Sequence, residues 1–221
     1  VGPSPAWIQS RLQACGIRPI SSIVDVTNYV LLEMGQPMHA FDMARLTGAQ
    51  IRVRTARAGE TLRTLDGQQR TLSPDMLVIA DAERAVAVAG VMGGADSEVT
   101  AATTTIVLES AYFNPLSVRR TSKALGLKTE ASMRFERGSD PRLPVTAMER
   151  ACALLERAQA GTTRGTVVDC YPKRIEPATR TLRRHKLAGL IGLTVPDGDV
   201  RRILEDLGFG LKEIDGGWDV T

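Results

Sequence analysis

The chain has 221 residues, of which 24% are charged and 43% hydrophobic, and its formal net charge is +3. This balance is typical of a globular protein and excludes a disordered tail or an extreme polycation. Two histidines and three widely spaced cysteines exclude a zinc cluster of CxxC or HxxxH spacing, and no apolar run reaches the length of a membrane span. We therefore expect a cytoplasmic protein with free thiols. Its first residue is not Met, and its last residues lie in an expected strand, which suggests a fragment of a longer chain.

Helical signals dominate the first part of the chain. Ser4 and Pro5 begin a short helix that Gly16 ends. The segment 22–34 is rich in β-branched residues, but its apolar residues repeat with helical steps up to Gly35, so we predict a second helix. His39 follows in an expected loop.

Short apolar runs separated by turn residues fill positions 51–110, and this pattern predicts a sheet. Asp66 and Gly67 form an expected hairpin turn, and residues 85–90 an expected buried strand that leads into a glycine-rich loop. Asn114 then caps a helix that ends at Gly126. A longer helix after Pro144 is expected to bury an apolar stripe, and residues 166–171 to form a closing strand. The stripe comprises Val145, Met148, Cys152 and Leu155.

The pattern restarts after a proline-containing linker at 173–178. We predict an α+β domain over residues 1–172, with a mixed sheet and packed helices. Residues 179–221 would form part of a winged-helix-like domain, with a strand, two helices and the start of a hairpin. The expected apolar faces of these helices comprise Leu187, Leu190 and Ile191 in one and Val200, Ile203, Leu204 and Leu207 in the other.

Several features could carry chemistry. Gly90, Gly93 and Gly94 match neither common phosphate-loop spacing, so they form a tight strand exit or a wall against which a substrate lies close to the backbone. His39 is either a structural histidine or a site residue, and a serine hydrolase is disfavoured because no G-x-S-x-G elbow is present. Glu109 interrupts an apolar strand; alternation puts it on one face with Val107, where it is either solvated or buried with a partner.

The segment 119–137 contains six basic residues and only two glutamates, so its excess of positive charge is larger than the net charge of the whole chain. This run is either a solvated helix face or a surface that follows phosphates. It comprises Arg119, Arg120, Lys123, Lys128, Arg134 and Arg137.

Long blocks of the sequence resemble the β subunits of bacterial phenylalanine–tRNA ligases. These blocks are SIVDVTNYVLLEMGQPMHAFD, GVMGGADSEV, LESAYFNPLSVRRTSKALGLKTEASMRFERG and RILEDLGF, and they occur in the order of the family. The resemblance covers nearly the whole chain. It implies that residues 1–172 are the tRNA-editing module and that the following residues open the next module.

The resemblance implies hydrolysis of mischarged tyrosyl-tRNA(Phe). Glu109 matches the glutamate that recognises the tyrosine hydroxyl, Gly93 a position in the pocket wall, and His39 a site histidine that orients substrate or water. Thr129 and Ala131 match further pocket residues. A pocket that hydrogen-bonds the hydroxyl can reject phenylalanine strongly, because phenylalanine would leave the polar group unpaired. The basic run would then guide the acceptor end of the tRNA.

The expected partners are tRNA(Phe) and the α subunit, in an α2β2 assembly. ATP and Mg²⁺ serve the whole enzyme, and the fragment itself needs no cofactor. A second hypothesis is a scaffold that binds tRNA or the α subunit without chemistry of its own. A DNA-binding role rests only on the partial second domain, whose recognition helix would place Glu205 and Asp206 beside Arg201 and Arg202.

Overall fold

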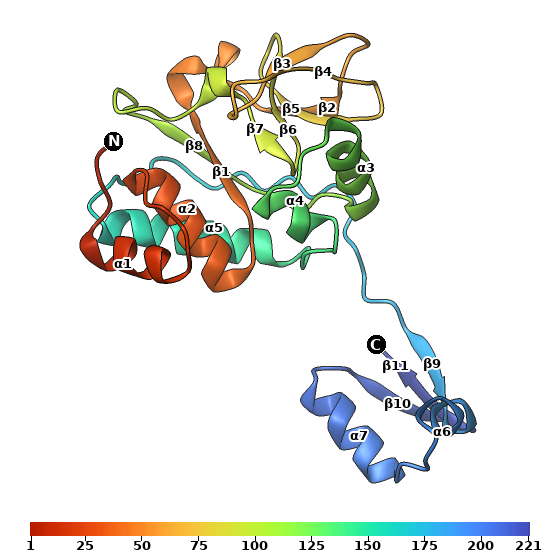
Figure 1. The fold of residues 1–221 in the computed structure, drawn as a ribbon. Coiled ribbons are helices and arrows are strands. Elements are labelled where there is room, and N and C mark those ends of the chain that lie inside the picture. The colour runs from red at the N-terminus through yellow and green to blue at the C-terminus, as the bar shows by residue number, and fades with distance from the viewer. The chain divides into compact units, whose positions relative to one another are not determined.

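Two units make up the chain, Val1–Asp169 and Cys170–Thr221, in a computed structural model that describes all of residues 1–221 (Figure 1). The first unit ends at residue 169, whereas the sequence predicts that the first domain ends at residue 172. The helices of the first unit are α1 (Ala6–Ala14), α2 (Ser22–Met34), α3 (Pro115–Leu125), α4 (Glu130–Phe135) and α5 (Leu143–Arg157). Its strands are β1 (Met38–Asp42), β2 (Arg52–Thr55), β3 (Thr61–Arg63), β4 (Gln69–Thr71), β5 (Leu77–Ala80), β6 (Ala85–Val88), β7 (Met92–Gly93) and β8 (Ile106–Ser110). The predicted α+β architecture is confirmed.

Local capping explains where the predicted helices begin and end. The Ser21 side chain accepts a hydrogen bond from the backbone N–H of Val24, and α2 ends at Gly35 with a φ of 75°. Asn114 accepts from the N–H groups of Leu116 and Ser117, and α3 ends at Gly126 with a φ of 63°. These side chains satisfy N–H groups that a helix start leaves unpaired, and the left-handed ends suit glycine.

Antiparallel pairing organises the strands of the first unit. A four-stranded sheet has the order β2-β5-β6-β7, and β3 and β4 form a hairpin around Asp66 and Gly67. A separate two-stranded ribbon pairs β1 with β8, and in its register His39 lies opposite Glu109. His39 therefore lies in a strand, not in the expected loop, because the long-range partner β8 orders this segment.

The β1–β8 ribbon separates two hydrophobic clusters. Phe41 and Val107 pack with the four-stranded sheet, whereas Ala40 and Leu108 pack with the helices. Figure 1 shows this ribbon between the sheet and the layer of α1, α2 and α5. Because strand side chains alternate between faces, His39 and Glu109 belong to the sheet side, with Phe41 and Val107.

Of two predictions about this end of the chain, one is partly wrong and the other is wrong. Helix α5 buries Leu155 of the predicted stripe and leaves Met148 and Cys152 half-buried, but Val145 is 40% exposed, and Ala147, Ala151 and Leu154 complete the buried face. Ala147, Ala151 and Leu154 pack in one cluster with Val26 and Val30 of α2, so the buried face of α5 is centred on these residues and not on Val145. Residues 166–171 form no strand and pair with none, and Val168 is 89% exposed.

The second unit contains β9 (Arg180–Arg183), α6 (Arg184–Ile191), α7 (Asp197–Asp206), β10 (Leu211–Ile214) and β11 (Gly217–Val220). Its sheet has the order β10-β11-β9, and the fully buried Trp218 lies under the guanidinium of Arg184, 4.5 Å from the ring centroid. The predicted elements are present, but of the expected apolar helix faces only Val200 is buried, and Leu190 is 86% exposed. A winged-helix identity stays a prediction. No helix in either unit is long and apolar enough to cross a membrane.

Candidate functional site

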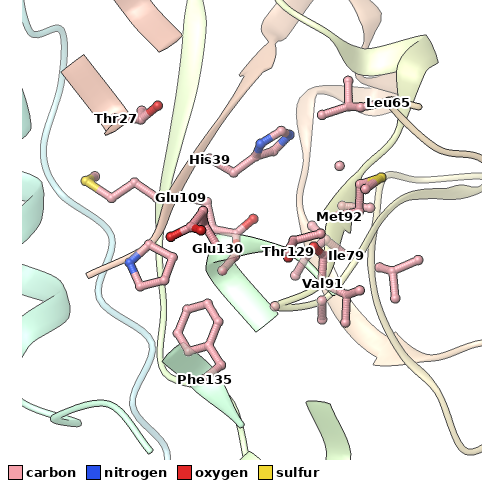
Figure 2. A pocket seen from close by; sticks show the side chains of 18 of the residues that line it. Thr27, His39, Leu65, Ile79, Val91, Met92, Glu109, Thr129, Glu130 and Phe135 are labelled. Atoms are coloured by element: carbon pink, nitrogen blue, oxygen red, sulfur yellow. Dashed lines mark hydrogen bonds between the residues drawn. The ribbon is translucent and has the colours of Figure 1, made fainter. Parts of the chain in front are cut away.

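A cavity of about 240 Å³ lies in the first unit, between the β1–β8 ribbon, the β6–β7 connection and the start of α4. All five residues expected in a pocket line it, namely His39, Gly93, Glu109, Thr129 and Ala131. Figure 2 shows His39, Glu109 and Thr129 around this cavity, supplied by β1, β8 and the residue that precedes α4. Residues that are far apart in the sequence are thus brought to one site.

Glu109 is the central acidic group of the cavity. Its side chain is half-buried and makes no hydrogen bond or ion pair with another protein group. Burial without a positive partner disfavours the charged form and raises the pKa of the carboxyl to about 7. The carboxyl is therefore close to half-ionised at neutral pH and has its full hydrogen-bonding capacity free for a ligand.

His39 lies opposite Glu109 on the neighbouring strand, and its ring packs edge-on against Phe41 at a centroid distance of 4.6 Å. Its Nε2 atom is buried and has no hydrogen-bond partner. Desolvation lowers the pKa of His39 to about 4, so the imidazole is neutral at neutral pH. A neutral imidazole can orient a ligand or water through Nε2, but it is a weak base.

Gly93 owes its size to His39. A Cβ atom at position 93 would lie 2.6 Å from Nε2 of His39 and 3.1 Å from Cδ1 of Leu65. Real side-chain carbons do not come this close, so the histidine ring occupies the space that a side chain would need. The sequence predicts that Gly93 lies in the pocket wall, and the structure shows that the residue must be glycine because of the neighbouring His39.

Thr129 holds the start of α4 in place. Its hydroxyl donates to the carbonyl of Val91 at 2.8 Å and accepts from the N–H of Ser132 at 3.0 Å. The Ser132 hydroxyl in turn accepts from the N–H of Thr129, which completes a capping box. The Thr129 hydroxyl is thus already hydrogen-bonded within the protein, and Ala131, two residues later in the first turn of α4, contributes only a small methyl to the wall.

The basic run lies on α3 and α4 and the segments beside them. Five of its members are exposed and have no carboxylate within 4.0 Å, namely Arg119, Arg120, Lys123, Lys128 and Arg137. Arg134 differs from them, because its guanidinium pairs with Glu130 at 2.7 Å and is half-buried. Five free cations therefore remain for an anionic partner.

Sequence reasoning missed several residues of the cavity wall. Thr27 and Asn28 of α2 reach it, as do Leu65 from the β3–β4 hairpin, Met92 of β7 and Glu130 of α4. Polar residues within the apolar period of α2 were the available signal, since Thr27 shares a face with the buried Leu31. For Leu65 no local signal existed, because the hairpin tip reaches the cavity only through tertiary packing.

Residues 1–160 match the sequence model of the family described as the B3/4 domain. The chain belongs to the B3/4 domain family. The β subunit of phenylalanine–tRNA ligase from Anaeromyxobacter dehalogenans is 52% identical over 98% of this chain, and that from Moorella thermoacetica is 49% identical over 100%. This B3/4 chain covers 27% of each of these two relatives. The resemblance to the ligase β subunits is confirmed.

A solved structure was also compared with this B3/4 chain. It is an N-terminal fragment of the phenylalanyl-tRNA synthetase β subunit from Pyrococcus horikoshii. The alignment covers 90% of this chain and 58% of that fragment, with 12% sequence identity and a TM-score of 0.44.

Proposed function

We propose that the cavity hydrolyses the ester bond of tyrosyl-tRNA(Phe), as the editing site of a phenylalanine–tRNA ligase β subunit. The observation that carries the proposal is Glu109, a half-buried carboxyl at the cavity with no protein partner. A tyrosine hydroxyl would give it a hydrogen bond. Phenylalanine would leave it desolvated and unpaired, a penalty that supports strong discrimination between two similar amino acids.

Water is the nucleophile that the cavity supports best. No Ser or Cys lines it, and the hydroxyls of Thr27 and Thr129 already donate to the carbonyls of Val24 and Val91. An aminoacyl ester is an activated acyl group, so orientation of a water molecule can supply much of the acceleration. We assign the orienting role to Nε2 of His39, because a pKa of about 4 makes it a poor general base near neutral pH.

The exposed cations of α3 and its flanks would receive the tRNA backbone. Arg119, Arg120 and Lys123 lie on α3, and Lys128 precedes the Thr129 cap, so positive charge extends toward the residues of the cavity wall. Phosphate binding by such residues weakens as salt rises. Arg134 belongs to this set only if its ion pair with Glu130 opens.

The whole enzyme would be a cytoplasmic α2β2 ligase that aminoacylates tRNA(Phe) with ATP and Mg²⁺. This chain does not fit those two cofactors. It has no group of three or more His, Cys, Asp or Glu side chains placed to hold a metal ion, and no Lys or Arg lines its cavity to bind phosphates. The synthetic reaction therefore belongs to other parts of the assembly.

Deacylation of tyrosyl-tRNA(Phe) tests the proposal. We expect hydrolysis by wild type and losses in Glu109→Ala, His39→Ala and Ala131→Trp, the last because the indole would fill the cavity. Equal rates in wild type and all three variants would refute the site. A chain that is inert alone, beside a complete enzyme that edits, would mean that the module depends on docking by other domains. Editing by a complete enzyme that all three substitutions leave unchanged would favour the second candidate, a scaffold that binds tRNA or the α subunit.

A further inference from the structure

The charged groups that line the cavity are acidic only. Glu109 and Glu130 supply two carboxyl groups, and no lysine or arginine lines the wall. His39 does not offset them, because burial lowers its pKa to about 4 and leaves it neutral. A ligand with a positive charge therefore finds partners here, whereas an added negative charge finds none among the side chains.

Glu130 has one carboxylate oxygen free for such a ligand. Its Oε2 accepts a hydrogen bond from Nη1 of Arg134 at 2.7 Å, and Oε1 has no partner. Arg134 also bonds to the Glu130 carbonyl at 2.9 Å but does not line the cavity. The Glu130 side chain is 58% exposed, so it lies at the solvent-facing rim of the cavity, where Figure 2 shows it near Glu109.

The proposed reaction changes the charge of the bound group. The aminoacyl ester carries an α-ammonium and no carboxylate. When water adds to the carbonyl carbon, the bond to the ribose oxygen breaks, and that oxygen takes up a proton. The acid that forms releases its own proton to solvent, so the free amino acid carries a new negative charge at its α-carbon end, in a cavity whose charged side chains are acidic.

We propose that this cavity selects the aminoacyl ester over the free amino acid by charge, with Glu130 as a specificity-determining residue. The inference rests on the proposed function and extends it to the release of product. With Glu109 at the phenol hydroxyl, the ammonium of the ester is attracted by Glu130, whereas the new carboxylate of the product is repelled by it. Free tyrosine would then leave rapidly and would compete poorly with mischarged tRNA.

Three small ligands separate the contributions when titrated into the full chain and followed by NMR or calorimetry. Tyramine has the phenol and the ammonium, tyrosine adds only the carboxylate, and phenethylamine lacks only the hydroxyl. We expect tyramine to bind about tenfold more tightly than tyrosine, as for one like-charge contact at a solvated site. Glu130→Gln should bring this ratio close to one, because it removes the carboxylate and leaves Arg134 uncompensated.

Glu136→Gln is the matched control, since Glu136 lies at the end of the same helix but does not line the cavity; its ratio should equal that of wild type. Tyrosine binding as tightly as tyramine, or a ratio unchanged in Glu130→Gln, would overturn the charge selection. Phenethylamine binding as tightly as tyramine would instead contradict the reading of the hydroxyl by Glu109. Failure of tyramine to bind at millimolar concentration would contradict both proposals.

Discussion

Position 93 requires glycine because the ring of His39 occupies the space that a side chain would need. The ring of His39 fills the space beside the Gly93 backbone and is itself held edge-on by Phe41. The position of Nε2 in the cavity thus depends on a missing side chain. The sequence predicts that Gly93 makes room for substrate, but in the structure it makes room for the ring of His39.

Gly93→Ala should displace this ring. The added Cβ would lie 2.6 Å from Nε2, so the ring would have to shift within the cavity that it lines. We expect a loss of about 1–3 kcal/mol in the free energy of unfolding, measured by chemical denaturation. The same substitution in a His39→Ala background should cost much less.

Gly161→Ala serves as the control, because a Cβ at position 161 meets no atom within 4 Å. If Gly93→Ala costs the same with and without the histidine ring, steric conflict with His39 is not the reason for the glycine.

Glu109 should make stability depend on pH. Its pKa of about 7 in the folded chain lies above the ordinary 4.5, so the folded state holds this proton more tightly than the unfolded state. Stability from this group is therefore present below pH 4.5 and is lost as pH rises to about 7. Relative to Glu109→Gln, wild type should lose about 2 kcal/mol across that window in denaturation experiments. Parallel curves for the two proteins would show that the carboxyl is solvated like a free one.

Helix α4 is fixed to the cavity by its first turn. The Thr129 hydroxyl bridges the N–H of Ser132 and the carbonyl of Val91, so one side chain both starts the helix and holds the segment before Met92. Residues on either side of this bridge line the cavity, which makes Thr129 a positioning residue in the structure.

Thr129→Val keeps the shape of the side chain but removes both hydrogen bonds. We expect it to destabilise the chain by about 1–2 kcal/mol, the usual effect of losing a helix cap, and to raise the KM for mischarged tRNA as the wall loosens. Thr129→Ser retains the hydroxyl and should restore most of both quantities. A valine variant that matches wild type in both quantities would show that the hydroxyl does not hold this segment in place.

The elements that the sequence predicts well are those with local causes. Ser21, Asn114 and Gly126 cap helices through their own backbone neighbours, and the Asp66-Gly67 turn fixes a hairpin. The strand at His39 depends on β8, which lies far along the chain, and so it could not be read from the MHAFD segment alone. The buried face of α5 likewise depends on its fit to α2.

The same distinction applies to the candidate site. The sequence setting singled out His39, Gly93 and Glu109, and the resemblance to ligase β subunits added Thr129 and Ala131 and grouped all five, which line one cavity. Neither composition nor periodicity predicts that these five residues lie close together, because β1, β8 and α4 meet only through tertiary packing. The acidic character of the wall was equally invisible, since Glu130 looks like an ordinary residue of a helix start.

The segment 161–179 spans the boundary between the two units, Val1–Asp169 and Cys170–Thr221. It contains no helix or strand, and nearly all of its residues are exposed. Limited trypsin digestion should therefore cut first at Arg164, Lys173 or Arg174 and leave a resistant fragment that contains the cavity, as mass spectrometry would show. First cuts between residues 1 and 160 would contradict this organisation.

We propose that Glu109 reads the tyrosine hydroxyl during editing, and a ratio of two deacylation rates tests this role. Deacylation of tyrosyl-tRNA(Phe) and phenylalanyl-tRNA(Phe) should be compared for wild type and Glu109→Ala in the same assay. We predict that wild type prefers the tyrosyl ester by orders of magnitude and that the variant loses most of this preference, mainly through slower tyrosyl hydrolysis. A preference that Glu109→Ala retains in full would contradict the account.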